Sequence, residues 1–199
     1  MGQVIFQTSM SLDGFMTASE QTAEEPLGTG GEQLHEWAFS SDPLDREYAE
    51  RTLSHGGAAI AGRVTYEHSL PWWGADGPSG SERIPVFVVT HQAPVESPAE
   101  SVYTFVTDGI ESALRQAQET AGDQDVVIIG GATLGRAFIA AGLVDEIVMH
   151  IVPVLFGSGT RMFEDMGVGH LQLEPIEVVG RPLATHIRYR FVRARPSTG

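Results

Sequence analysis

The stretch DVVIIGGATLGRAF, residues 125–138, contains the transition that decides the fold. Asp125 precedes the apolar run Val126–Ile129, which is followed by the glycine pair Gly130-Gly131 and a sequence of helical character. This order predicts a buried strand that turns directly into a helix. Such a turn can present the N–H groups of a helix start to a phosphate. It can equally be a tight corner, because close packing and positive φ also favour glycine.

Strand-like and helix-like segments alternate on both sides of this stretch. Further strands are predicted from Gln3 to an end near Ser9 or Met10, and at 57–61, 86–89, 102–106 and 146–152. Helices are predicted from Pro43 towards Gly56, over 64–70 and 134–141, and from an Asp108 cap to Ala121, with Pro71 ending the second of them. This alternation favours a mainly parallel sheet with helices on both faces.

The C-terminal part follows a different pattern. Residues 171–179 and 186–195 resemble two strands joined by the turn Gly180-Arg181-Pro182, which predicts an antiparallel hairpin added to the sheet. We therefore expect an α/β fold of three layers in a single domain, residues 1–199. The polar, glycine-rich segment 17–31 is expected to be a functional loop, since long loops inside compact domains are often lids.

Composition excludes several classes of function. The chain has 199 residues, 42% of them hydrophobic, and 12 basic against 26 acidic residues give a net charge of −14, which disfavours nucleic acid and anionic membranes as partners. Lysine is absent, which excludes Schiff-base chemistry, and cysteine is absent, which excludes thiol nucleophiles and cysteine zinc sites. No long apolar segment or signal peptide is evident, so a soluble, cytoplasmic protein is expected.

A second strand-to-helix transition carries a candidate anion site. Gly62-Arg63-x-Thr65 follows the predicted strand 57–61 and opens a helix. An arginine and a hydroxyl at a helix start suit a phosphate monoester, although the arginine could simply lie on a solvated first turn. Two such helix starts in one sheet suit a dinucleotide, which has a pyrophosphate and a separate ribose end to bind.

Five ordered blocks carry a family resemblance. They are SMSLDGFM (9–16), AGRVTYE (61–67), VFVVTH (86–91), IIGGATL (128–134) and GLVDEIVMHIVPVLFGSGTRMF (142–163). With these blocks the chain resembles the dihydrofolate-reductase-like superfamily, and most closely the stand-alone relatives of the reductase domain of bifunctional riboflavin-biosynthesis deaminase/reductases.

The resemblance implies a dihydrofolate-reductase-like fold, a homodimer and a reductase that uses NADPH rather than NADH on a small heterocyclic substrate. By matching position it implies a pyrophosphate contact for Gly130, Gly131, Ala132, Thr133 and Leu134. It assigns the adenosine 2′-phosphate side to Gly62, Arg63, Thr65, Thr90 and His91. Ser9 and Met16 would lie near the nicotinamide.

The chain also departs from the family. Thr90-His91 stands where a Ser-Arg pair is frequent, which weakens the preference for NADPH because a neutral histidine binds phosphate less well than arginine. The zinc deaminase half cannot exist here without cysteine. Residues 31–42 show no match for the buried carboxylate that binds the pterin in dihydrofolate reductases.

Candidates for acid–base chemistry are few. Asp13, in the Ser-Leu-Asp-Gly turn, is the best candidate for binding or protonating a heterocycle, and an Asx turn is the alternative. His150 is expected to be a hydrogen-bonded core residue, and FGSGT, 156–160, is expected to be a turn or bulge at the end of the sheet rather than the site of a nucleophile. We expect no metal, because His68 and His170 have no partners at ligand spacing.

Other polar and aromatic side chains could enter the cleft. Glu32, His35 and Glu36 are expected on a solvated helix face, whereas Trp72 and Trp73 could stack on a flat substrate or cover the edge of the core. Three hypotheses follow: an NADPH-dependent reductase acting on a C=N or C=O bond of a pteridine- or aminopyrimidine-like compound, a nucleotide-binding protein of the same fold without catalysis, and a flavin-binding or flavin-reducing protein.

Overall fold

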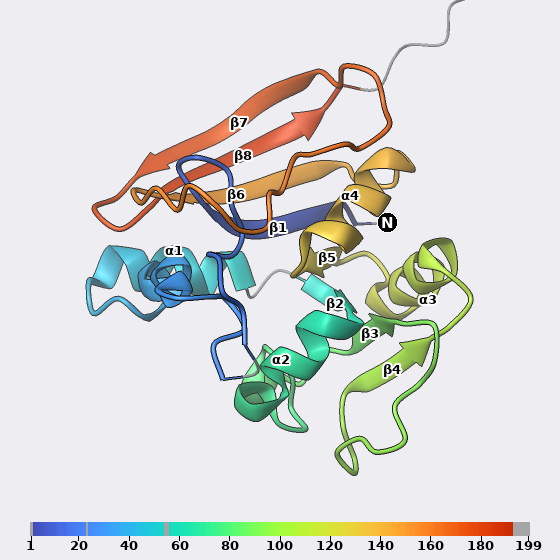
Figure 1. Cartoon of the computed structure of the whole chain (residues 1–199). Coiled ribbons are helices and arrows are strands. Elements are labelled where there is room, and N and C mark those ends of the chain that lie inside the picture. The colour runs from blue at the N-terminus through green and yellow to red at the C-terminus, as the bar shows by residue number, and fades with distance from the viewer. Residues whose placement is uncertain (1, 23, 54–55, 193–199) are drawn as a thin grey trace, which may run out of the picture.

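A computed structural model describes residues 2–22, 24–53 and 56–192 (Figure 1). One sheet of eight strands runs in the order β4-β3-β2-β5-β1-β6-β8-β7. The strands are β1 (Val4–Ser11), β2 (Gly56–Gly62), β3 (Val86–Val89), β4 (Tyr103–Val106), β5 (Asp125–Ile129), β6 (Glu146–Val152), β7 (Leu173–Gly180) and β8 (Thr185–Phe191). The helices are η1 (Gly31–Phe39), α1 (Pro43–Leu53), α2 (Arg63–Trp73), η2 (Gly80–Glu82), α3 (Ile110–Ala121) and α4 (Ala132–Ala140), of which η1 and η2 are 3₁₀ helices.

The pairing of the strands confirms the predicted fold class. β1 to β6 pair in parallel, whereas β8 pairs antiparallel with β6 and with β7. β2 and β5 are apolar over most of their length, and every residue of β1 is buried, because both faces of this part of the sheet are covered. β7 lies at the outer edge, and most of its residues are exposed.

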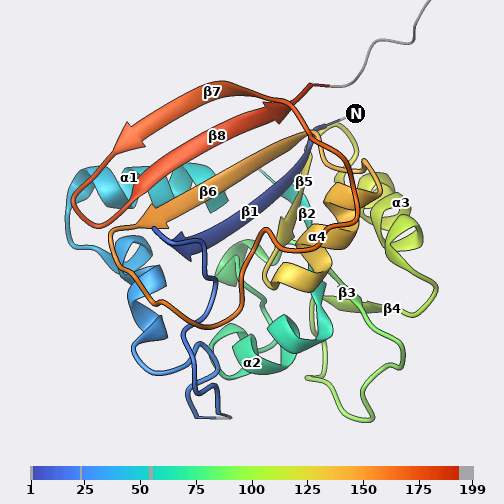
Figure 2. The same cartoon turned by 45° about the horizontal axis from the view of Figure 1, so that its top comes forward.

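Helices cover both faces of the sheet (Figure 2). On one face α3 and α4 pack over a core that contains Phe6, Ile60, Ile128 and Phe138. On the other face η1 and α1 enclose a second cluster around Trp37, and α2 packs against β2, β3 and β4. β1 alternates between these faces, so Phe6 and Met10 join the first core while Gln7 and Ser9 face η1.

Two local predictions are wrong, each for a physical reason. Pro71 does not end its helix, because α2 continues to Trp73 and closes with a 2.9 Å bond from the N–H of Gly74 to the carbonyl of Leu70. Asp108 does not cap α3, since Gly109 with φ of +103° occupies that position and no described side chain caps the helix. β1 ends at Ser11, one residue beyond the predicted end near Ser9 or Met10, because β6 pairs with it as far as Val152.

Other boundaries agree with the pattern. The side chain of Asp42 accepts a hydrogen bond of 2.8 Å from the N–H of Leu44, as expected of an N-cap before Pro43. Gly122 with φ of +62° ends α3 as predicted. The predicted last strand ends at Phe191, and residues 193–195 lie outside the described residues. Within the described ranges, no helix is long and apolar enough to cross a membrane.

Candidate functional site

The parallel arrangement brings the predicted binding residues to one edge of the sheet. β1, β2, β3 and β5 end at the same edge because they run in one direction. Gly62 therefore ends β2, Thr90 and Gly130 directly follow β3 and β5, and Ser9 lies two residues before the end of β1. In open α/β sheets this edge is where ligands bind.

The glycine pair after β5 is in direct contact with the helix that follows β2. The N–H of Gly131 donates a 3.1 Å hydrogen bond to Oγ1 of Thr65. Gly130 adopts φ of +101°, and a Cβ atom there would overlap the Thr65 side chain. Gly130 is thus required by backbone conformation and close approach. Gly131 has ordinary φ of −61°, and its Cβ would lie 3.8 Å from Thr65 Oγ1, so it leaves open surface.

The start of α4 offers further donors beside this corner. No side chain among the described residues caps this helix. The N–H groups of Ala132, Thr133 and Leu134 form its first turn, where donors lack intrahelical partners and the helix dipole is positive. This geometry can hold an anion without any cationic side chain.

Arg63 is joined to the loop after β3. Its Nη1 donates a 2.8 Å hydrogen bond to the carbonyl of Gln92, and Thr90 Oγ1 donates to the same carbonyl at 2.8 Å. Arg63 Nε and Nη2 also contact the carboxylate of Glu67 at 2.6 Å. The structure thus brings Gly62, Arg63, Thr90 and exposed His91 together, and it adds Glu67 as a competitor for any anion at Arg63. The Arg63–Glu67 spacing of four residues on a helix was a signal for this pair.

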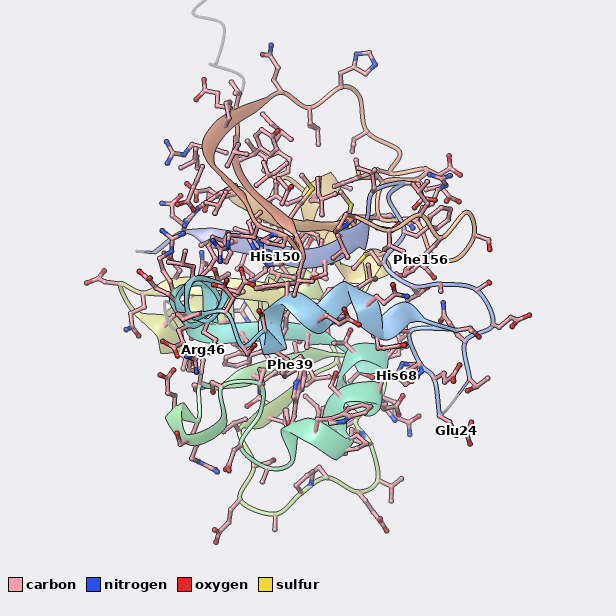
Figure 3. The ribbon with its side chains drawn as sticks, turned by 90° about the vertical axis from the view of Figure 1, so that its left-hand side faces the viewer. Glu24, Phe39, Arg46, His68, His150 and Phe156 are labelled. Atoms are coloured by element: carbon pink, nitrogen blue, oxygen red, sulfur yellow. The ribbon has the colours of Figure 1, made fainter. Side chains whose placement is uncertain are left out.

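Asp13 connects two loops. Its carboxylate accepts hydrogen bonds from Ser11 Oγ at 2.5 Å and from the N–H groups of Gly157 at 2.7 Å and Phe156 at 3.2 Å. The Ser11 hydroxyl and these N–H groups lower the pKa of Asp13, against an opposing effect of desolvation. The carboxylate is therefore ionised at neutral pH and fixes the turn at 11–14 to the loop after β6, which contains Phe156 (Figure 3).

The segment FGSGT forms a turn, as predicted. Gly157 and Gly159 have φ of +71° and +135°, and a Cβ at Gly159 would overlap the backbone of Thr17. The N–H of Met16 donates to the carbonyl of Thr160 at 2.8 Å, so this turn holds the start of the 17–31 loop. Residue 23 of that loop lies outside the described residues.

Ser9 and Met16 lie on opposite faces of the sheet. Met16 is buried in the core under α4, while the Ser9 hydroxyl accepts a 3.1 Å hydrogen bond from Trp37 Nε1. Trp37 was missed by the sequence analysis, although the spacing of Leu34 and Trp37 on one helix face was a usable signal. Trp72 is 74% exposed and Trp73 packs against the β3–β4 core, so neither lies beside Ser9.

His150 is a buried, hydrogen-bonded core residue, as predicted, and it has an unpredicted partner. Its Nδ1 lies 2.8 Å from Nδ1 of His186, and its Nε2 lies 3.1 Å from Nε2 of Gln7. Burial lowers the pKa of both histidines, that of His186 to about 4. Glu32, His35 and Glu36 are exposed on η1. Within the described ranges, no three His, Asp or Glu side chains form a group that could hold a metal.

Comparison with known proteins gives consistent relatives. The model of the RibD C-terminal domain matches residues 3–184. The riboflavin biosynthesis protein RibD of Mycobacterium tuberculosis is 34% identical over 65 residues, which is 30% of this chain and 19% of that protein. The match thus spans about a fifth of that relative.

Solved structures share the fold over nearly the whole chain. A crystal structure described as a putative riboflavin biosynthesis protein from Shewanella sp. PV-4 has a TM-score of 0.73 at 21% identity and covers 96% of this chain and 99% of its own. The dihydrofolate reductase of Enterococcus faecalis, solved with NADP(H), has a TM-score of 0.62 at 17% identity and covers 96% of each chain.

Proposed function

Because the chain belongs to the RibD C-terminal domain family, we propose that it is an NADPH-dependent reductase of a small heterocyclic C=N or C=O compound of pteridine or aminopyrimidine type. The observation that carries this proposal is the hydrogen bond from Gly131 to Thr65, which brings the two predicted phosphate-binding segments into contact. A dinucleotide needs two such anion sites at the carboxyl edge of one sheet.

The residues at this edge fit the cofactor. Gly131 leaves open surface beside the first turn of α4, where the N–H groups of Ala132, Thr133 and Leu134 would bind the pyrophosphate. Gly130 and Gly62 allow a ligand to approach the backbone closely at the ends of β5 and β2. The nicotinamide would lie at the end of β1, with Ser9 on one face of the sheet and the buried Met16 on the other. NADPH, when bound, supplies the hydride.

Arg63, Thr65, Thr90 and His91 would hold the 2′-phosphate end. Arg63 and the Thr90 hydroxyl already meet at the carbonyl of Gln92, so they stand close enough to act on one anion. Glu67 competes for the guanidinium and reduces the advantage of NADPH over NADH.

We propose that Asp13 acts as a positioning residue. Its three hydrogen bonds hold the turn that leads from Ser9 to Met16, and its lowered pKa removes it as a proton donor at neutral pH. Because the Asp13 carboxylate already accepts hydrogen bonds from Ser11, Phe156 and Gly157, it is not available as a proton donor. This favours the second candidate function, a nucleotide- or flavin-binding protein of the same fold that lacks reductase activity.

A homodimer is proposed as the assembly. β7 is an edge strand, and Ile176 and Val178 on it are 43% and 61% exposed. Exposed apolar edge strands favour pairing with another chain. Light scattering of the purified protein measures the mass directly, and a monomer at micromolar concentration would exclude this assembly.

Titration with NADPH and NADH, followed by tryptophan fluorescence and melting temperature, tests the proposal. The reductase hypothesis requires that NADPH binds. It also requires that at least one compound in a panel of pterins, flavins and ribosylaminopyrimidines oxidises NADPH in the presence of the protein. Binding without turnover supports the second candidate, and colour in the purified protein supports a bound flavin. If neither nucleotide changes the tryptophan fluorescence or the melting temperature, both the reductase hypothesis and the nucleotide-binding hypothesis are rejected.

A further inference from the structure

A row of three buried polar side chains crosses the sheet next to the proposed site. Gln7, His150 and His186 come from the adjacent strands β1, β6 and β8, and all lie on the face covered by η1 and α1. His150 pairs with His186 across the β6–β8 ladder. Trp37 packs on His150 and Tyr48 stacks on His186, each with ring centroids 4.0 Å apart. Figure 3 shows His150 at the level of the strands, next to η1.

With the amide nitrogen of Gln7 placed towards His150, the hydrogen bonds of this row run in one direction, and the reverse orientation of the amide would invert each of them. The amide nitrogen of Gln7 only donates, so Nε2 of His150, 3.1 Å away, is the acceptor. A neutral His150 then carries its proton on Nδ1 and donates to Nδ1 of His186 at 2.8 Å. His186 in turn carries its proton on Nε2, which is sealed from solvent and has no partner among the described residues.

The opposite end of the row faces a cavity. Gln7 and Ile129, paired across β1 and β5, line a cavity of about 40 Å³ together with Thr52, Ser79, Ile84 and Val127. Gln7 Oε1 accepts no hydrogen bond from any described residue, yet it is not among the sealed polar atoms without a partner. Since Gln7 Nε2 faces His150, the carbonyl oxygen of the same amide is directed away from the histidines, towards the cavity.

One end of the cavity reaches the proposed cofactor edge, whereas Gly56 and Ala58, at the start of β2, line its other end. Ile129 immediately precedes Gly130, and Ser9 follows Gln7 on the same face of β1. The volume of about 40 Å³ exceeds that of a single water site, and the cavity is bounded by Thr52 of α1 and by Pro78, Ser79 and Ile84 of the loop at 78–84. Apart from Gln7, its walls are formed by apolar side chains and two hydroxyl residues, Thr52 and Ser79.

We propose that Gln7 is a specificity-determining residue, and that its carbonyl oxygen accepts a hydrogen bond from a ring or exocyclic N–H of the heterocyclic substrate. His150 and His186 act as positioning residues, because their proton order fixes which end of the Gln7 amide faces the cavity. The proposal rests on the proposed reductase function and narrows its substrates to heterocycles that present an N–H at the leading edge. A site built around an acceptor discriminates against analogues that lack the donor.

The proton order can be measured without any substrate. Nitrogen-15 NMR of the labelled protein near pH 7 should show His150 protonated on Nδ1 and His186 protonated on Nε2. Gln7→Met should remove the donor to His150 and shift its Nε2 resonance, whereas Gln116→Met, on α3 across the sheet, should leave both histidines unchanged. A wild-type His150 protonated on Nε2 would overturn the proposal, because Gln7 would then present its NH₂ group to the cavity.

Specificity is tested with pairs of heterocycles that differ by one N-methyl group. Wild-type protein should favour the N–H compound by roughly 10-fold to 100-fold in kcat/KM, mainly through KM, and Gln7→Met should lose this preference while it still turns over the methylated compound. Equal preference in both proteins would contradict the role of Gln7.

The same pairs separate this proposal from the reductase proposal. If no compound oxidises NADPH, the reductase proposal fails, and the shift in melting temperature on adding each compound without nucleotide measures the contribution of Gln7. A larger shift with the N–H compound in wild type, absent in Gln7→Met, supports the role of Gln7. Identical shifts in the two proteins reject it.

Discussion

The N–H of Gly131 donates a 3.1 Å hydrogen bond to Oγ1 of Thr65, a residue 66 positions earlier in the chain. The bond joins the helix start after β2 to the one after β5, on adjacent parallel strands. The glycine pair therefore has two roles. Gly130 is required by the fold, because a side chain there would overlap Thr65, whereas Gly131 leaves surface open for a ligand. This division makes the two glycines separable by mutation.

Gly131→Val should leave a folded protein and weaken NADPH binding at least 10-fold, because the side chain fits the fold but occupies the surface beside the α4 start. Gly130→Val should lower the free energy of unfolding by several kcal/mol, since φ of +101° and the contact with Thr65 both exclude a side chain. Fluorescence titration and urea unfolding measure the two effects. Gly169→Val, in open space, is the control. Unchanged NADPH affinity in Gly131→Val would mean that the pair is only a turn.

Glu67→Gln should release Arg63 for a phosphate. We expect NADPH to bind roughly 2-fold to 5-fold more tightly, which corresponds to the ~0.4–1 kcal/mol of an exposed ion pair. NADH affinity should stay constant, because NADH lacks the 2′-phosphate. Calorimetric titration of both nucleotides measures the ratio, with Glu119→Gln on α3 as the control for net charge. An equal gain for both nucleotides would show that Arg63 does not contact the 2′-phosphate.

Tyr66→Phe should raise the free energy of unfolding by about 1 kcal/mol. Tyr66 is 1% exposed, and its ring packs edge-on against the rings of Tyr103 and Phe105. Its hydroxyl is buried and has no hydrogen-bond partner among the described residues. Tyr103→Phe is the matched opposite case, since that hydroxyl donates to the carbonyl of Gly74 at 2.9 Å. It should lose about 1 kcal/mol in the same urea unfolding experiment. Destabilisation by both changes would indicate that Tyr66 has a partner.

Acidification should destabilise the protein between about pH 6.5 and pH 4. Burial lowers the pKa of His186 to about 4, from 6.5 when unfolded, and that of His150 well below its usual range. In this window the unfolded chain binds more protons than the folded one, so stability is full above pH 6.5 and falls as pH decreases. His186 alone accounts for on the order of 3 kcal/mol. Asp45 and Glu177 oppose the shift, while Arg181 and Arg51 increase it.

Urea unfolding at several pH values checks this dependence. His186→Phe should flatten the curve in the acidic range, whereas His170→Gln, an exposed position, should not. A wild-type curve that is level from pH 7 to pH 4.5 would show that the two histidines titrate normally and that the buried row does not exist as described.

The order of elements could be predicted because it depends on local patterns. Short apolar runs separated by turns predicted the strands, and the change to an antiparallel hairpin after residue 170 was visible in turn residues and alternation. Local patterns were less reliable for boundaries: Pro71 is tolerated near the end of α2, and Gly109 rather than Asp108 starts α3.

The sequence by itself determined that two strand-to-helix turns with phosphate-binding character exist, since glycine, arginine and threonine at a helix start have that meaning in any fold. Only the tertiary structure decided that these two turns are joined by the hydrogen bond from Gly131 to Thr65. It also decided that Arg63 forms an ion pair with Glu67, and that the Asp13 carboxylate accepts hydrogen bonds from Ser11, Phe156 and Gly157. It also placed Gln7, His150 and His186 in one row, although 143 residues separate the first two. Such contacts depend on strand order and register, which come from the packing of the whole chain and are not encoded in the spacing of any one segment.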